Sequence, residues 1–192
     1  MTEFDTAANF SYRPEFLASG PATALLHSLW TETRWQQHQI SVFGRKVPQP
    51  RLTSWQGDSG VCYRYSGLTL LARGWDPALM RLRRKLEQEI GAEFNSVLLN
   101  AYRDGQDSMG WHSDDEKELG NCPVIASVSL GETRQFLIRG GVPKRTATLP
   151  LEHGSLLIMQ GCSQSAFRHS LPKTAKASGL RINLTFRKIF IE

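Results

Sequence analysis

The sequence lacks the features typical of membrane-spanning, disulfide-stabilised and disordered proteins. No apolar run approaches the roughly 18 residues that a membrane-spanning helix needs, and no long block of like charges is present. The three cysteines, Cys62, Cys122 and Cys162, lie far apart and never in a CxxC spacing. Neither a disulfide framework nor a zinc ribbon is therefore indicated. We expect a globular protein whose thiols are reduced and mostly buried.

The first ten residues, MTEFDTAANF, contain acids and lack the basic start and apolar stretch of a secretory signal. We therefore expect an intracellular protein, cytoplasmic if bacterial. The length of 192 residues, 40% of them hydrophobic, is enough to bury a core and close to the size of one domain. We expect a single domain over residues 1–192, with residues 1–40 as an N-terminal extension. The net charge of +5 favours a polyanionic partner.

The spacing of apolar residues predicts two helices followed by many strands. Helical spacing is found between Ala22 and Glu32, and Asp76 and Pro77 are typical of an N-cap and a first helical residue. Short apolar or alternating runs, separated by glycine and proline, predict strands at 94–102, 123–131, 134–140, 147–151, 154–161 and 181–189. This order favours an α+β fold, in which N-terminal helices pack on one sheet of a jelly roll with antiparallel connections.

A candidate metal site is formed by His112, Asp114 and His169. His112 and Asp114 are two positions apart, so an extended segment directs both side chains to one side. Two histidines and one carboxylate, with other coordination positions left open, are the ligands of non-haem Fe(II) oxygenases. Taken alone, an HxD sequence with a distant histidine is more often a set of ordinary surface residues.

The last predicted strand carries a second candidate site. Arg181, Asn183, Thr185 and Arg187 occupy every second position and therefore share one face. One interpretation is an amphipathic edge strand whose polar face lies in water. The other places this face inside a barrel, where two buried guanidinium groups require an anion, and a dicarboxylate offers two carboxylates that arginine binds in a bidentate manner. Asn100 and Tyr102 alternate in a similar way on their own predicted strand.

Together these segments resemble the AlkB family of Fe(II)- and 2-oxoglutarate-dependent nucleic-acid dealkylases, and are most similar to its duplex-DNA-repair branch. The resemblance covers roughly residues 40 to 190. It rests on the order and spacing of NAY (100–102), HSDDE (112–116), SVSLG (127–131), HGSLLIM (153–159), HSLP (169–172) and RINLTFRKI (181–189). The resemblance implies a double-stranded β-helix, a jelly roll that holds the metal between its sheets, in agreement with the predicted strands.

The resemblance also implies the roles of the two candidate sites. It makes His112, Asp114 and His169 the Fe(II) ligands, which form the catalytic centre. The residues implied to bind 2-oxoglutarate are Arg181, Arg187, Asn100, Tyr102 and Thr185. The implied reaction uses O2, converts 2-oxoglutarate to succinate and CO2, and hydroxylates an N-alkyl carbon. The hydroxylated carbon is then released from the base as an aldehyde.

An enzyme that acts on a base within a duplex must first flip this base out of the stack. Three aromatic residues are candidates for this step, one as a wedge and two as the pocket for the flipped base. Phe43, in VFG, matches a hydrophobic hairpin finger of the branch and would act as a wedge between stacked bases. Tyr63 and Tyr65 match positions that form the base pocket, where Tyr65 would stack on the base. The alternative for all three is ordinary packing in the core.

Three polar residues match substrate-binding positions by the same resemblance. Asp115 and Glu116 would accept hydrogen bonds from an exocyclic amine and favour a cationic alkylated base, unless they belong to a solvated acidic loop. Arg51 matches a position near the catalytic pocket. The segment GGVPKRT, at 140–146, is shorter than the basic stretch of some duplex-acting relatives, which implies fewer phosphate contacts.

The function implied by the resemblance is the oxidative dealkylation of bases such as N1-methyladenine and N3-methylcytosine in DNA repair. We expect a monomer that acts on alkylated DNA, duplex or single-stranded, without a membrane partner. The same chemistry on RNA or protein is one alternative. A jelly roll that binds nucleic acid without catalysis is the other.

Overall fold

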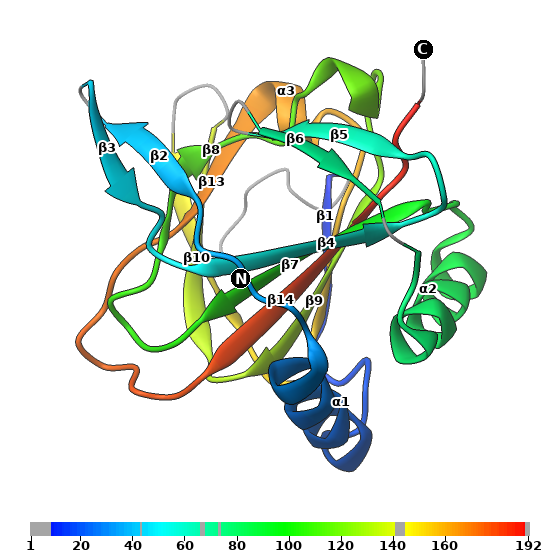
Figure 1. Ribbon diagram of the computed structural model, residues 1–192, viewed down its shortest axis with the longest axis horizontal. Coiled ribbons are helices and arrows are strands. Elements are labelled where there is room, and N and C mark those ends of the chain that lie inside the picture. The colour runs from blue at the N-terminus through cyan, green and yellow to red at the C-terminus, as the bar shows by residue number, and fades with distance from the viewer. Residues whose placement is uncertain (1–8, 43, 66–67, 73, 141–144, 191–192) are drawn as a thin grey trace.

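Two antiparallel sheets face each other in the computed structural model, which describes residues 9–42, 44–65, 68–72, 74–140 and 145–190 (Figure 1). The larger sheet has the spatial order β1 (Phe10–Arg13), β12 (Leu156–Met159), β9 (Ile125–Gly131), β14 (Arg181–Arg187), β7 (Ser96–Tyr102) and β4 (Leu52–Gly57). The smaller sheet has the order β11 (Arg145–Leu151), β10 (Arg134–Gly140), β13 (Phe167–Leu171) and β8 (Met109–His112). This is the jelly roll that the alternating sequence predicts, with helices on one sheet.

Two long helices, α1 (Ser19–Glu32) and α2 (Pro77–Ile90), cover the outer face of the six-stranded sheet (Figure 1). Helix α2 begins as predicted, because the Asp76 carboxylate accepts hydrogen bonds from the backbone N–H groups of Ala78 and Leu79. The helix ends at Gly91, whose φ of 73° is in the left-handed region that glycine adopts without strain. The short elements are α3 (Ser163–Ala166) and the 3-10 helix η1 (Lys117–Leu119).

The central strand β14 is buried on both faces along its whole length. It lies between β7 and β9, so neighbouring strands satisfy its backbone on both sides. Ile182, Leu184 and Phe186 are fully buried in the core that the six-stranded sheet forms with α1 and α2. The opposite, polar face of β14 is buried inside the roll. The interpretation of this strand as an exposed amphipathic edge is therefore wrong.

Two small hairpins extend from the roll. One is formed by β2 (Gln39–Val42) and β3 (Arg45–Pro48), and the other by β5 (Cys62–Tyr65) and β6 (Leu68–Leu71). An isolated bridge between Gly57 and Gly74 closes the base of the second hairpin. No helix among the described residues is long and apolar enough to cross a membrane.

Two expectations from the sequence need correction. The helices do not precede the strands, because β1 comes before α1 and five further strands lie between α1 and α2. These strands are only four to six residues long, so their alternation is too brief to be distinctive. The thiols of Cys62, Cys122 and Cys162 are free but exposed, whereas we expected most of them to be buried.

Candidate metal centre and dicarboxylate pocket

The three predicted metal ligands meet inside the roll. Strands β8 and β13 pair so that His112 lies opposite His169, and the two imidazole centroids are 4.2 Å apart. Asp114 follows β8 directly and is buried. One possible ligand atom from each of the three residues lies within 4.8 Å of the other two. The tertiary pairing of two strands thus brings together residues that are 57 positions apart in the chain, from 112 to 169.

Both histidines are held in the neutral form that can bind a metal ion. The Nδ1 atom of His112 is 2.9 Å from the carbonyl oxygen of Gly110, which can only accept, so Nδ1 carries the proton and Nε2 keeps its lone pair. Burial lowers the pKa of His112, and burial together with the neighbouring His112 lowers the pKa of His169 to about 3. Neutral imidazole is therefore available at both positions at neutral pH.

Asp114 is ionised and firmly oriented. Burial alone would raise the pKa of its carboxyl group, but opposing interactions, of which the charge of Arg187 is the largest, lower the pKa to about 2. Its Oδ2 atom accepts a hydrogen bond from Arg187 at 2.8 Å, while Oδ1 lies 3.8 Å from Nε2 of His112. Its backbone N–H donates to Oε1 of Gln164 at 2.9 Å. One carboxylate oxygen is thus directed at the histidines and the other is fixed by an arginine.

Arg181 is a buried cation at the other end of the same polar face. It is 2% exposed, and burial lowers its pKa to about 10, so it remains charged at neutral pH. Its Nη2 atom donates to the hydroxyl of Ser129 at 3.0 Å, and its guanidinium carbon is 5.2 Å from the ring centroid of Tyr102. Within the described part of the chain no carboxylate pairs with it. A buried arginine in this state favours an anionic ligand.

A cavity between the two sheets connects the triad with the arginines. Polar groups and a few apolar side chains line it: Asn100, Tyr102, Met109, His112, Asp114, Ser127, Phe136, Leu151, Met159, His169, Leu171, Arg181, Asn183, Thr185 and Arg187. Asn183 donates to the Ser127 hydroxyl at 2.8 Å and accepts from Thr185 at 3.0 Å. The carbonyl oxygen of the Asn100 side chain accepts from Nε of Arg51 at 2.9 Å. Neighbouring side chains therefore fix the polar wall of the cavity in position.

The donors in the cavity fit a metal ion beside a dicarboxylate. Among the described residues, Asp114 Oδ1, His169 Nδ1 and Arg181 Nε are buried atoms without a hydrogen-bond partner. A buried polar atom without a partner costs about 1–3 kcal/mol. Two imidazoles and a carboxylate suit a divalent transition metal with open coordination positions, and the free guanidinium edge suits a carboxylate.

A protein-family model described as the 2OG-Fe(II) oxygenase superfamily matches residues 9–187, nearly the whole chain. The chain belongs to the 2OG-Fe(II) oxygenase superfamily. Members of this superfamily use Fe(II), 2-oxoglutarate and O2, in agreement with the donors that meet in the cavity. The expected cofactor and cosubstrates are thereby confirmed.

The oxygenase is similar to curated AlkB proteins, which confirms the resemblance found in the sequence. It is 40% identical over 187 residues to the alpha-ketoglutarate-dependent dioxygenase alkB homolog 3 of Rattus norvegicus, covering 92% of this chain and 63% of that protein. It is 44% identical over 161 residues to the human DNA oxidative demethylase ALKBH2, covering 80% of this chain and 62% of that protein. The chain thus spans less than two thirds of the length of these relatives.

A solved structure of OsALKBH1 shares the fold of the oxygenase. The TM-score is 0.67 at 17% sequence identity, and the match covers 94% of this chain and 98% of the other. This likeness confirms the α+β jelly roll.

The predicted substrate residues lie apart from the inner cavity or outside the described parts of the chain. Phe43 is not among the described residues, and Tyr63 and Tyr65 lie on β5, where only the backbone is described. Asp115 is exposed and Glu116 is half-buried, directly after Asp114 in the chain. Neither is among the described residues that line the cavity.

Arg51 lies behind the wall of the cavity and not in it. It is 4% exposed, and besides its bond to Asn100 it donates to the carbonyl oxygen of Ser108 at 3.3 Å. The bond from Arg51 to Asn100 orients the amide of Asn100, which is predicted to bind 2-oxoglutarate.

Three polar residues of the site were not predicted from the sequence. Ser127 and Ser129 contact Asn183 and Arg181, and their alternation in SVSLG is a signal that could have placed them on the inner face. Gln164, which orients the backbone of Asp114, lies in the short helix α3. No pattern in the sequence marks Gln164, because its contact depends on the tertiary approach of two loops.

Proposed function

We propose that this oxygenase removes alkyl groups from nucleic-acid bases by oxidation. The observation that carries the proposal is the cavity in which two histidines and an aspartate meet beside two buried arginines. Further support comes from similarity to a protein named as a DNA oxidative demethylase. Bases such as N1-methyladenine and N3-methylcytosine are the proposed substrates, and DNA repair is the proposed role. The products are succinate, CO2, an aldehyde and the repaired base.

The proposal gives a role to the three candidate metal ligands, to the two arginines and to three neutral residues of the cavity. His112, Asp114 and His169 hold Fe(II), which supplies O2 activation coupled to the decarboxylation of 2-oxoglutarate. Arg181 pairs with one carboxylate of 2-oxoglutarate. Arg187 holds Asp114 in the ionised, oriented form in which it would bind the metal. Hydrogen bonds from neutral groups complete the pocket, through Asn100, Tyr102 and Thr185.

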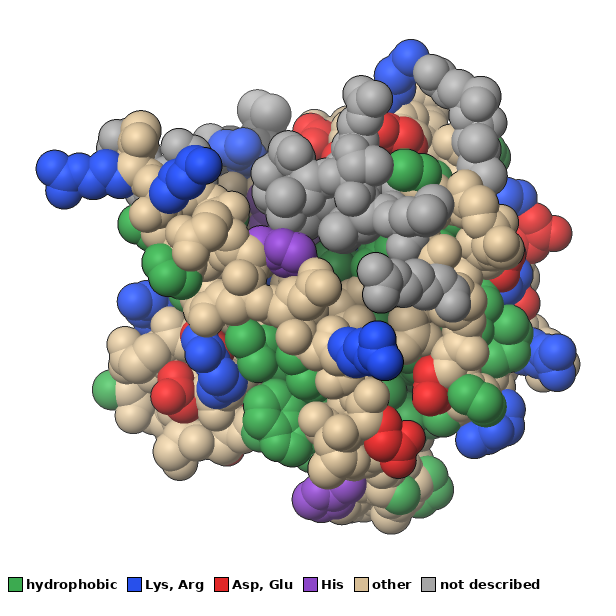
Figure 2. All heavy atoms as spheres, viewed as in Figure 1, with side chains coloured by type: hydrophobic (Ala, Val, Ile, Leu, Met, Phe, Trp, Pro, Cys, Tyr) green, Lys and Arg blue, Asp and Glu red, His purple; other side chains and the backbone are tan. Residues whose placement is uncertain are grey.

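Alkylated DNA, duplex or single-stranded, is the proposed partner. The chain carries a net charge of +5, and Lys and Arg side chains extend from the β2–β3 hairpin on the left of Figure 2. Such side chains neutralise phosphates without reading sequence. Phe43, which lies between β2 and β3 in the sequence, is proposed as the wedge, and Tyr63 and Tyr65 as the base-stacking residues. Asp115, Glu116 and Arg51 are proposed to contact or support the substrate pocket.

The remaining properties are part of the same proposal. We propose that residues 1–192 act as a single domain, that the oxygenase works as a monomer, and that it acts inside the cell, where its nucleic-acid substrate is found.

The test is a single-turnover reaction. The protein is loaded anaerobically with Fe(II) and 2-oxoglutarate, mixed with an oligonucleotide that carries one N1-methyladenine or N3-methylcytosine, and exposed to O2. Succinate and the methyl mark are followed together, on single-stranded DNA, duplex DNA and RNA of one sequence. We expect succinate and demethylated base in equal amounts on DNA, and none with the unmethylated oligonucleotide.

Other outcomes would change the proposal. Succinate without demethylation of any oligonucleotide would exclude nucleic-acid dealkylation and direct the search to a protein substrate. Faster demethylation of RNA than of DNA would exclude the DNA-repair role. If folded, iron-loaded protein forms neither succinate nor demethylated base, the result would favour a jelly roll that binds nucleic acid without catalysis.

A further inference from the structure

The β5–β6 arm, here residues 58–75, is an excursion from the six-stranded sheet. The chain leaves β4 at Gly57 and returns at Gly74, and a bridge joins these two glycines. A Cβ atom at Gly57 would lie 2.7 Å from the carbonyl oxygen of Asn95, so only glycine fits where the arm leaves the sheet. The arm is therefore attached to the roll by a narrow stem at which backbones meet closely.

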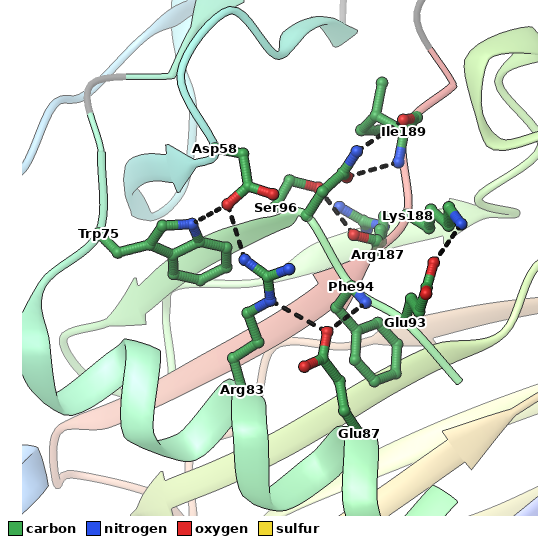
Figure 3. Close-up of polar contacts among 11 residues, drawn as sticks. Asp58, Trp75, Arg83, Glu87, Glu93, Phe94, Ser96, Arg187, Lys188 and Ile189 are labelled. Atoms are coloured by element: carbon green, nitrogen blue, oxygen red, sulfur yellow. Dashed lines mark hydrogen bonds and ion pairs between the residues drawn. The ribbon is translucent and has the colours of Figure 1, made fainter. Parts of the chain in front are cut away.

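A side-chain cluster joins the two ends of this stem to helix α2 (Figure 3). Oδ1 of Asp58, at the start of the arm, accepts a hydrogen bond from the indole N–H of Trp75, at its end, at 2.7 Å. The same oxygen accepts from Nη1 of Arg83, on α2, also at 2.7 Å. We call Asp58, Trp75 and Arg83 the stem clamp. One carboxylate oxygen thus connects both strands of the stem with a helix outside it.

The stem clamp is itself anchored to the rigid part of the fold. The guanidinium of Arg83 donates through Nε to Glu87 at 3.0 Å, and the same Glu87 oxygen accepts from the backbone N–H of Phe94 at 2.9 Å, just before β7 (Figure 3). The ring of Trp75 stacks on Phe186 of β14, with centroids 6.2 Å apart and an interplanar angle of 10°. Arg83 also lies over the Trp75 ring, 5.1 Å from its centroid.

The arm is also connected to the candidate active site through its own small core. Val61 and Ala72 of the arm are buried in a cluster that includes Leu119, in the loop that follows Asp114. Met109, which lines the inner cavity, packs against the same cluster. In Figure 1, β5 and β6 lie at the same end of the roll as β8 and α3. A displacement of the arm at its stem would therefore shift its contacts with Leu119 and Met109, which lie beside the cavity.

The energies indicate a local role for the clamp. The side chain of Asp58 is 43% exposed, and such a partly exposed ion pair contributes at most about 1 kcal/mol to global stability. A hairpin of two strands is marginally stable by itself and depends on its attachments. The clamp contacts have little to add to a core of buried leucines, but they act where the arm has few other anchors.

We propose that Asp58, Trp75 and Arg83 are positioning residues that hold the β5–β6 arm against the segment that follows Asp114 and so set the affinity for the nucleotide substrate. This inference rests on the proposed function, because β5 carries Tyr63 and Tyr65, the proposed base-stacking residues. The clamp touches neither metal ligands nor the arginines of the inner cavity. Its loss affects the oligonucleotide and leaves 2-oxoglutarate binding unchanged.

Two variants test the clamp. Trp75→Phe removes only the indole N–H and keeps a ring that stacks on Phe186, and Arg83→Met removes the charge and keeps an apolar stem. Arg84→Met, at an exposed position of the same helix, is the matched control. We expect Trp75→Phe to raise the KM for a methylated oligonucleotide about fivefold, as expected for the loss of one hydrogen bond at a hinge. Arg83→Met should raise this KM at least as much, because it also removes the bond to Glu87. The KM for 2-oxoglutarate stays at the wild-type value.

Hydrogen–deuterium exchange provides a readout that does not depend on activity. We expect faster exchange of the amides at 61–65 and 68–72 in Trp75→Phe and Arg83→Met, with unchanged protection of β7 and β14. Wild-type protein that demethylates no oligonucleotide contradicts the proposed function, whatever the variants do. Active wild-type protein with clamp variants that match Arg84→Met contradicts the positioning role. Equal increases in the KM for oligonucleotide and for 2-oxoglutarate also overturn it, because they indicate a general structural effect.

Discussion

The two faces of the six-stranded sheet come from the same strands, but the outer face stabilises the fold and the inner face lines the cavity. Its outer face buries Leu184, Phe186 and their apolar neighbours under helices α1 and α2. Its inner face buries Arg181 and Arg187, which are each 2% exposed and line the cavity. Burial of apolar surface stabilises the fold, whereas burial of a charge costs stability unless a ligand or partner compensates it. Apolar burial on the outer face therefore offsets the cost of the charges buried on the inner face. Substitutions on the outer face should lower stability, and substitutions on the inner face should lower activity.

The largest expected effect is on activity and comes from the inside of the roll. His169→Ala removes one of three proposed ligands, and we expect turnover to fall by at least about 10³-fold, as for the loss of an essential catalytic group. The fold should persist, because the imidazole Nδ1 makes no hydrogen bond within the described structure. Coupled succinate and demethylation assays, with a thermal melt beside them, measure both quantities. Full activity in the purified, metal-checked variant would exclude His169 as a ligand.

The next effect lies on the outer face and concerns stability. Leu184 is fully buried in the core under the helices, so Leu184→Ala leaves a cavity and should lower the free energy of unfolding by about 2–5 kcal/mol. Urea denaturation measures the change. The KM for 2-oxoglutarate should stay unchanged in the folded variant. A large rise in this KM would mean that the two faces are coupled, which would break the comparison.

A smaller effect is expected at Arg181, where a substitution should weaken 2-oxoglutarate binding without lowering the stability of the ligand-free protein. Arg181→Met removes the proposed charge-assisted contact with the cosubstrate and should raise the KM for 2-oxoglutarate about 100-fold, equivalent to about 2.7 kcal/mol. The ligand-free protein should melt at the same temperature or higher, because a desolvated cation has been replaced by an apolar side chain. Arg181→Lys keeps the charge but not the fork, and should fall between the two. Clear destabilisation without a change in KM would assign Arg181 to the core.

The smallest effect tests a local feature of the outer layer. Asp76→Ala removes the side-chain cap of α2 and should reduce the free energy of unfolding by about 1 kcal/mol. Gln88→Ala, at an exposed position of the same helix, is the control and should change little. Denaturation curves for the three proteins provide the comparison. A loss in Gln88→Ala equal to that in Asp76→Ala would mean that the cap contributes nothing specific.

Much of the fold could be predicted because the sequence patterns are local. The alternation in RINLTFR correctly separates an apolar from a polar face, and Asp76-Pro77 marks the start of α2. The strands before α2 were not predicted from their pattern, because strands of four to six residues carry too few alternations. The exposure of the thiols was also mispredicted, since cysteine is usually buried but the exposure of any one residue depends on its neighbours in space.

The candidate site divides in the same way. His112 and Asp114 are close in the chain and Arg181 and Arg187 share a strand, so residue type and spacing made them candidates, and the family resemblance implied their roles. Gln164 and Ser129 contact these residues only after folding, and Arg51 lies behind Asn100 where a substrate contact was expected. Contacts of this kind leave no periodic signal in the sequence.

The sequence by itself determined which residue types are available for chemistry and which face of each strand they occupy, because side chains alternate along a strand whatever surrounds it. Only the tertiary structure decided that the polar face of β14 is buried, that His169 lies opposite His112, and that Asp58 joins Trp75 to Arg83. The physical reason is that burial, ion pairing and pKa depend on distances between segments far apart in the chain. These distances exist only once the two sheets have closed around the cavity.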